Sequence, residues 1–127
     1  GLLFVFCISV IPAVFEELLF RKVMIDYSRK IGKVFAIFIS SLIFGLVHMN
    51  FGQGIFAFIL GIILGIIYTK TGSIKTTMTI HFCNNFYAAL AVLFADAGVV
   101  LNIIGFSVIG IGIAITLLTL VKNRKKW

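Results

Sequence analysis

Seven polar side chains lie within otherwise apolar stretches of this chain, and their types are the ones that carry out chemistry. They comprise two carboxylates, one guanidinium, two imidazoles and two amides: Glu16, Glu17, Arg21, His48, His81, Asn84 and Asn85. An ionisable group at the centre of a bilayer costs about 2.5–3.5 kcal/mol even on a mild insertion scale, so such groups are usually functional. Acid, base and N–H donors together form a set suited to hydrolysis.

The spacing of these residues predicts which of them share a helix face. Glu17 and Arg21 are four residues apart, so they point the same way and can form an ion pair. Glu16 points about 100° away from Glu17, which leaves its carboxylate for chemistry. His81 and Asn85 are also four apart and project together.

Counting along a helical hairpin predicts the depth of the candidate residues. Glu16 lies sixteen residues before Gly32 and His48 lies sixteen after it. Both therefore sit about 20 Å above the turn, where a carboxylate and an imidazole can meet. His81 is six residues beyond Lys75, which leaves it about 10 Å shallower. Either the segment before this helix dips into the bundle or the helix is displaced along its axis, and the sequence leaves both open.

The composition shows what kind of protein must position these groups. Hydrophobic residues make up 61% of the 127 and charged residues 12%, against about half and a quarter in soluble domains. This excludes a soluble globular domain and a disordered chain, and two cysteines give no disulfide framework. One Pro and 14 Phe fit membrane helices and do not fit the alternating strands of a β-barrel.

The chain is therefore expected to be all-α, a polytopic transmembrane helix bundle that forms a single domain over 1–127. Five helices are expected: 2–29, 34–50, 54–69, 76–95 and 98–121. Pro12 is expected to bend the first helix a turn before Glu16. Ala57, Gly61 and Gly65 recur every four residues and should let the third helix approach a neighbour closely. Because the chain begins with Gly rather than Met, we expect upstream helices to be missing.

The net charge of +7 follows a membrane pattern rather than a nucleic-acid-binding one. The eleven basic residues form three clusters: Arg21, Lys22, Arg29, Lys30 and Lys33; Lys70 and Lys75; Lys122, Arg124, Lys125 and Lys126. The breaks at 50–54 and 96–98, which divide the longer apolar stretches, contain no Lys or Arg. Five crossings would place every basic residue on one face, as the positive-inside rule expects of the cytoplasm.

At the polar residues the chain also resembles a known family. Residues 16–21 read Glu-Glu-Leu-Leu-Phe-Arg, residues 44–48 Phe-Gly-Leu-Val-His and residues 81–85 His-Phe-Cys-Asn-Asn. They are similar to the Glu-Glu-x-x-x-Arg, Phe-x-x-x-His and His-x-x-x-Asn motifs of the CPBP family, the CAAX proteases and bacteriocin-processing enzymes. Lys22 departs from the pattern, since many members have Gly there, and should affect packing more than chemistry.

The resemblance implies an intramembrane endopeptidase of the glutamate type in a bacterial cell membrane, with a peptide or protein substrate and no metal or other cofactor. A carboxylate partly removed from water is a better base near neutral pH. Carried over by position, the roles are water activation by Glu16 and His48, oxyanion stabilisation by His81 and Asn85, and scaffolding by Glu17 and Arg21. The substrate class stays open among prenylated C-terminal tails, peptide pheromones and bacteriocin precursors.

Two other interpretations remain. Glu16, His48 and His81 are three possible zinc ligands that leave a fourth position for water, although the chain lacks His-Glu-x-x-His spacing. The chain could also be a protein without turnover, such as a bacteriocin self-immunity protein or a proton or ion pathway. Pairing of His81 with Asn85 on one face favours hydrolysis, because a relay has no need of it.

Overall fold

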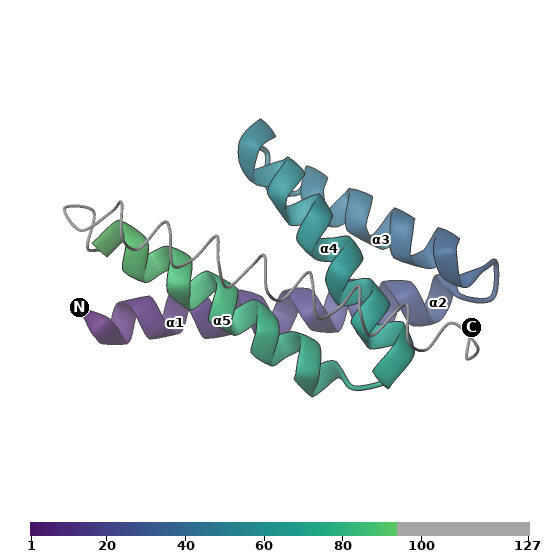
Figure 1. The fold of residues 1–127 in the computed structure, drawn as a ribbon, viewed down its shortest axis with the longest axis horizontal. Coiled ribbons are helices and arrows are strands. Elements are labelled where there is room, and N and C mark those ends of the chain that lie inside the picture. The colour runs from purple at the N-terminus through teal and green to yellow at the C-terminus, as the bar shows by residue number, and fades with distance from the viewer. Residues whose placement is uncertain (94–127) are drawn as a thin grey trace, which may run out of the picture. The chain divides into compact units, whose positions relative to one another are not determined.

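The computed structural model describes residues 1–93, which are helical apart from short turns (Figure 1). The elements are α1 (Leu2–Glu17), the π-helix η1 (Leu18–Ile25), α2 (Asp26–Ser28), α3 (Lys33–Leu46), α4 (Phe51–Thr71) and α5 (Ile74–Leu93). The first three run on as one helix from Leu2 to Ser28. Gly1–Phe86 form one compact unit and Tyr87–Trp127 a second, of which the structure describes the part of α5 up to Leu93.

The four helices expected within the described residues are present, which confirms an all-helical fold for this part of the chain. Pro12 lies inside α1 without ending it, and the irregular part of the first helix is η1. The expected fifth helix (98–121) and the break at 96–98 lie outside the described residues.

The turn between α3 and α4 differs from the expected one, and its capping residues explain why. α3 ends at Leu46 rather than at residue 50, and Met49 adopts a positive φ of 50°. Asn50 then accepts a hydrogen bond through its side-chain oxygen from the backbone N–H of Gln53 at 3.1 Å. Asn is among the most favourable N-cap residues, so α4 begins directly after it rather than at residue 54.

Small residues let α3 and α4 pack closely, as the repeat on the third helix predicts. A Cβ atom at Gly61 would lie 3.1 Å from the Cα of Ser41, and one at Gly65 would lie 3.0 Å from the side chain of Ile37. Ala57 in the same stripe is buried. The closest approach was not expected: a Cβ at Gly45 would lie 2.7 Å from the carbonyl oxygen of Gly54.

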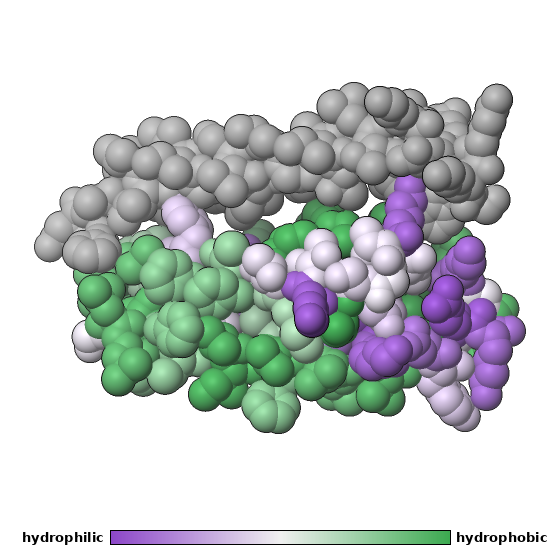
Figure 2. Space-filling view, turned by 90° about the horizontal axis from the view of Figure 1, so that it is seen from below, coloured by the Kyte–Doolittle hydropathy of each residue, from purple (hydrophilic) through white to green (hydrophobic). Residues whose placement is uncertain are grey.

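Away from the turn between α3 and α4, the helices pack around a buried apolar cluster. It is formed by Ile25, Ala36, Ile37 and Tyr68, with Ile74 packed against it. The Tyr68 hydroxyl also donates to Asp26 at 2.9 Å, which ties α4 to the first helix. Arg29, Lys30 and Lys33 lie in or beside the turn before α3, and Lys70 and Lys75 lie on either side of the turn before α5. Figure 2 shows hydrophilic residues gathered towards one end of its visible face. These five residues agree with the expected one-sided distribution, whereas Arg21 is buried beside Glu17 and the third basic cluster lies outside the described residues.

Two helices of the described part are long and apolar enough to cross a membrane, Leu2–Ser28 and Phe51–Thr71. The 21 residues of α4 extend about 32 Å, close to the roughly 30 Å of a hydrocarbon core. α3 has 14 residues and is shorter. Phe4 and Phe15 are among many large apolar side chains that are exposed, as expected of a lipid-facing surface. The structure thus supplies two candidate spans where four were expected within these residues.

Gly45→Ala should destabilise the protein by about 1–3 kcal/mol, because its methyl group would collide with the backbone carbonyl of Gly54. Gly52→Ala is the matched control, since its Cβ would meet nothing closer than 3.6 Å. Thermal unfolding in detergent should show a lower midpoint for Gly45→Ala and an unchanged or higher one for Gly52→Ala. Equal midpoints for the two variants would contradict the close packing of α3 against α4.

Candidate active site

A buried ion pair on the first helix organises the candidate site. Arg21 Nε lies 3.1 Å from Glu17 Oε2, and both side chains are fully buried. This is the pair that the four-residue spacing predicts. The guanidinium also lies over the ring of Phe44, with its central carbon 5.1 Å from the ring centroid. Two charges removed from water in this way need such close partners to be tolerated.

Ser40 on α3 supports this pair, and sequence reasoning missed it. Its hydroxyl donates to the backbone carbonyl of Phe20 at 2.7 Å and accepts a hydrogen bond from Arg21 Nη1 at 3.4 Å. Phe20 and Arg21 both lie in η1, and π-helical turns are often found at functional sites. Side chains that insert into a carbonyl ladder are a known cause of such irregularity. The adjacent Ser40 and Ser41 in an apolar helix were the available signal.

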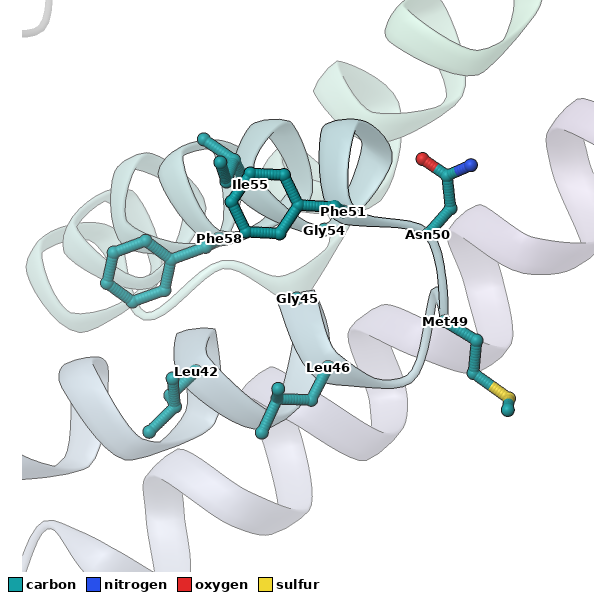
Figure 3. Close-up of a pocket in the computed structure, with 9 residues that line it drawn as sticks. All are labelled: Leu42, Gly45, Leu46, Met49, Asn50, Phe51, Gly54, Ile55 and Phe58. Carbon is teal, nitrogen blue, oxygen red and sulfur yellow. The ribbon is translucent and has the colours of Figure 1, made fainter.

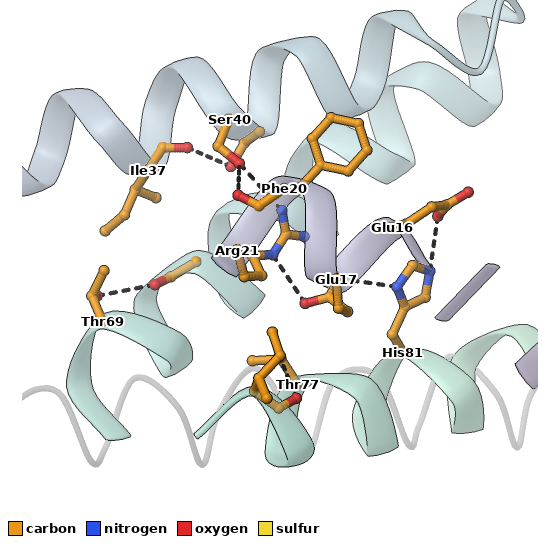
Figure 4. A network of polar contacts seen from close by, with 12 residues as sticks. Glu16, Glu17, Phe20, Arg21, Ile37, Ser40, Thr69, Thr77 and His81 are labelled. Atoms are coloured by element: carbon orange, nitrogen blue, oxygen red, sulfur yellow. Dashed lines mark hydrogen bonds and ion pairs between the residues drawn. The ribbon is translucent and has the colours of Figure 1, made fainter. Parts of the chain in front are cut away.

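The imidazole of His81 lies between the two adjacent carboxylates of the first helix (Figure 4). Its Nδ1 is 3.0 Å from Glu17 Oε1, within hydrogen-bond distance, and its Nε2 is 3.6 Å from Glu16 Oε2. The ring is almost fully buried, whereas the Glu16 side chain is 31% exposed. One imidazole therefore contacts a buried carboxylate on one edge and an accessible carboxylate on the other.

This contact answers the question of depth that the sequence left open. Glu17 lies eleven residues before Ser28, about 17 Å along the helix, and His81 lies seven after Ile74, about 10 Å along α5. Ile74 packs against the cluster that contains Ile25, one turn before the end of α2. α5 therefore starts deeper along the first helix than the end of α2, and its third turn reaches the carboxylates.

His48 is placed differently from the expectation. Its Nδ1 lies 2.8 Å from the backbone carbonyl oxygen of Phe44, so this nitrogen is the donor and Nε2 is left for another partner. His48 and Glu16 are not within ion-pair distance of one another. The Phe44 ring lies next to both imidazoles, with centroids 5.1 Å from His48 and 5.6 Å from His81. The imidazole that contacts Glu16 is thus His81.

Asn85 follows His81 by one helical turn, and its side chain is half-buried. The amide of Asn84 donates to Asn85 Oδ1 at 3.3 Å. The oxygen of Asn85 thus accepts from its neighbour, and the NH2 group is the part of the amide that can donate. The predicted role of Asn85 as a donor to the oxyanion stays a prediction.

The zinc interpretation needs three converging ligands. Among residues 1–93, no group of three or more His, Cys, Asp or Glu side chains is arranged to hold a metal ion. Glu16 and His81 are adjacent, whereas His48 lies in the turn after α3 and bonds to the backbone carbonyl of Phe44.

A separate apolar groove lies between α3 and α4, near the turn that joins them (Figure 3). Its volume is about 400 Å³, and it is lined by Leu42, Gly45, Leu46, Met49, Asn50, Phe51, Gly54, Ile55 and Phe58. None of the predicted site residues lines it.

Comparisons with known proteins point to one family. The family model described as type II CAAX prenyl endopeptidase Rce1-like matches residues 1–87. The membrane-embedded CAAX protease MroQ of Staphylococcus aureus (strain USA300) is 30% identical over 95 residues, which cover 69% of this chain and 38% of MroQ. The chain thus spans well under half the length of that relative. No solved structure gives a significant match.

Arg21→Met should lower the free energy of unfolding by about 3–5 kcal/mol, because it leaves the buried carboxylate of Glu17 without its charged partner. Lys22→Met is the matched control: Lys22 forms an ion pair with Asp26 at the same spacing, but its side chain is 61% exposed, so little change is expected. Denaturant titration in mixed micelles measures both. Similar losses in the two variants would show that burial does not set the strength of the Glu17–Arg21 pair.

Proposed function

The chain belongs to the Rce1-like family of type II CAAX prenyl endopeptidases, and from this membership we propose that it carries the active site of a membrane-embedded endopeptidase. The proposed reaction is hydrolysis of a peptide bond in a peptide or protein substrate. The observation that supports it best is the buried imidazole of His81 beside the accessible carboxylate of Glu16. Acid–base groups of this kind are rare inside membrane helices unless they have a function.

Glu16 is proposed as the general base, together with His48. Its exposed fraction lets a water molecule reach the carboxylate, while the apolar surroundings keep bulk water away from most of the site. His48 donates from Nδ1 to a backbone carbonyl, which leaves Nε2 to accept from a water molecule. The two groups are not in contact, so the water and the substrate would occupy the space that separates them.

The proposed reaction needs only a water molecule, the substrate and the side chains of this site. Glu16 takes a proton from water as the water oxygen attacks the carbonyl carbon, and the C=O electron pair moves to oxygen. N–H donors from His81 and Asn85 stabilise this oxyanion, an effect typically worth about 2.7–4 kcal/mol per donor. When the C–N bond breaks, Glu16 returns its proton to the leaving amine. Glu17 and Arg21 hold the scaffold.

The proposed location is a bacterial cell membrane, with several crossings. MroQ, a bacterial relative, is described as membrane-embedded. The positive-inside rule places the basic turns before α3 and α5 on the cytoplasmic side. The substrate would then be cleaved near that side of the membrane.

Glu16→Gln should lower kcat by about 10²- to 10⁴-fold, because an amide cannot accept the proton of water. Asp26→Asn is the matched control, since Asp26 is a carboxylate of the same helix that pairs with Lys22 and Tyr68 away from the site. Both variants should be assayed against a peptide library in nanodiscs, with and without a chelator. Full activity of Glu16→Gln would refute the proposal, and loss of wild-type activity in chelator with recovery on adding zinc would favour the metalloprotease.

A further inference from the structure

We infer that Glu17 is a positioning residue for His81: its carboxylate holds a proton on Nδ1 and so presents Nε2 to Glu16 and the reacting groups. This inference rests on the proposed function and deepens it. It assigns to Glu17 a role beyond neutralising Arg21.

The hydrogen bond between Glu17 and His81 fixes which ring nitrogen carries a proton. A carboxylate oxygen paired with a guanidinium is ionised and can only accept, so at 3.0 Å Nδ1 of His81 must be the donor. The ring and the carboxylate are both buried, so water does not compete for this bond. In the native structure the proton on Nδ1 is therefore held in place.

Each oxygen of the Glu17 carboxylate has its own partner, and these two contacts fix the orientation of the carboxylate. Oε1 faces His81 and Oε2 faces Arg21. Arg21 is held in turn by Ser40 from α3 and by the face of Phe44. A continuous set of contacts thus runs from α3 through the first helix to α5, and the imidazole is its last member. The orientation of the ring follows from packing of all three helices.

Because Nδ1 of His81 is bonded to Glu17, Nε2 is the ring nitrogen that faces Glu16 and the reacting groups. Its distance of 3.6 Å from Glu16 Oε2 is longer than a good hydrogen bond, so the two groups are close without being locked together. With Nδ1–H held by Glu17, Nε2 donates to the oxyanion only when the ring carries a proton on both nitrogens, and this second N–H lies in the ring plane on the side that faces Glu16. A buried carboxylate holds the histidine of a Ser-His-Asp triad in the same manner.

A purely structural role for Glu17 makes a different prediction from a positioning role. Replacing both members of a buried ion pair with apolar residues of similar volume is often neutral or stabilising. Glu17→Leu/Arg21→Met should therefore fold, while Nδ1 of His81 loses its acceptor. Glu17→Gln/Arg21→Met is the matched variant, because the Gln carbonyl oxygen can still accept from Nδ1 without a charge at either position.

The kinetic test compares these two double variants of the full chain in nanodiscs, with thermal unfolding measured for each. We expect kcat to fall about 10- to 100-fold for the Leu variant with KM little changed, and to recover about tenfold in the Gln variant. Wild-type kcat in a folded Leu variant would overturn the inference. Equal losses in the Leu and Gln variants would also overturn it, because the acceptor at position 17 would then make no difference.

A spectroscopic test needs no substrate and is made on the wild type, with one variant used only for assignment. The chain has two histidines, so ¹⁵N-histidine labelling with a His48→Asn variant for assignment isolates the signals of His81. The wild type should show a directly bonded proton on Nδ1 of His81, and a bare Nδ1 would overturn the inference. Glu16→Gln, assayed in parallel, separates the two proposals: an active Glu16→Gln refutes the endopeptidase mechanism, whereas an inactive one beside a fully active Leu variant refutes the positioning role alone.

Discussion

The need to satisfy two charges that have been removed from water shapes this helical unit more than any other constraint. Glu17 and Arg21 are fully buried in a chain with 61% hydrophobic residues, where a lone charge would be strongly unfavourable. Two neighbouring helices contribute to their neutralisation or hydrogen bonding: α3 through Ser40 and Phe44, and α5 through His81. The pair is thus the point at which the packing of three helices and the proposed chemistry meet.

Close approach of α3 and α4 makes this arrangement possible. The backbones touch at Gly45 and Gly54, and Gly61 seats against Ser41 and Phe44. The ring of Phe44 in turn contacts Phe20 and Arg21 of the first helix, and it also contacts both imidazoles. Because a well-packed aromatic ring has little freedom to move, glycines outside the site help to fix the geometry within it.

Two adjacent glutamates of one helix have different environments, and these suit them to different roles. Glu17 is completely buried and engaged at both oxygens, whereas Glu16 is 31% exposed and touches one imidazole edge. Neighbouring carboxylates set apart by their surroundings are a recurrent feature of acid–base catalysis. Consecutive side chains of a helix point in different directions, and this together with the position of α5 is enough to produce the difference between Glu16 and Glu17.

Local spacing predicted the Glu17–Arg21 pair and the small-residue contacts of α4, because both depend on helix geometry alone. It could not predict that Glu16 meets His81 rather than His48, since a contact between helices depends on where each helix starts. Gly72 ends α4 just before Ile74, and Ile74 packs against the cluster that contains Ile25. This start of α5 brings His81 to the carboxylates. The support by Ser40 likewise depends on how α3 lies against a π-helical turn. Sequence periodicity specifies directions around one helix, and the axial offset between helices comes from side-chain packing that only the tertiary structure contains.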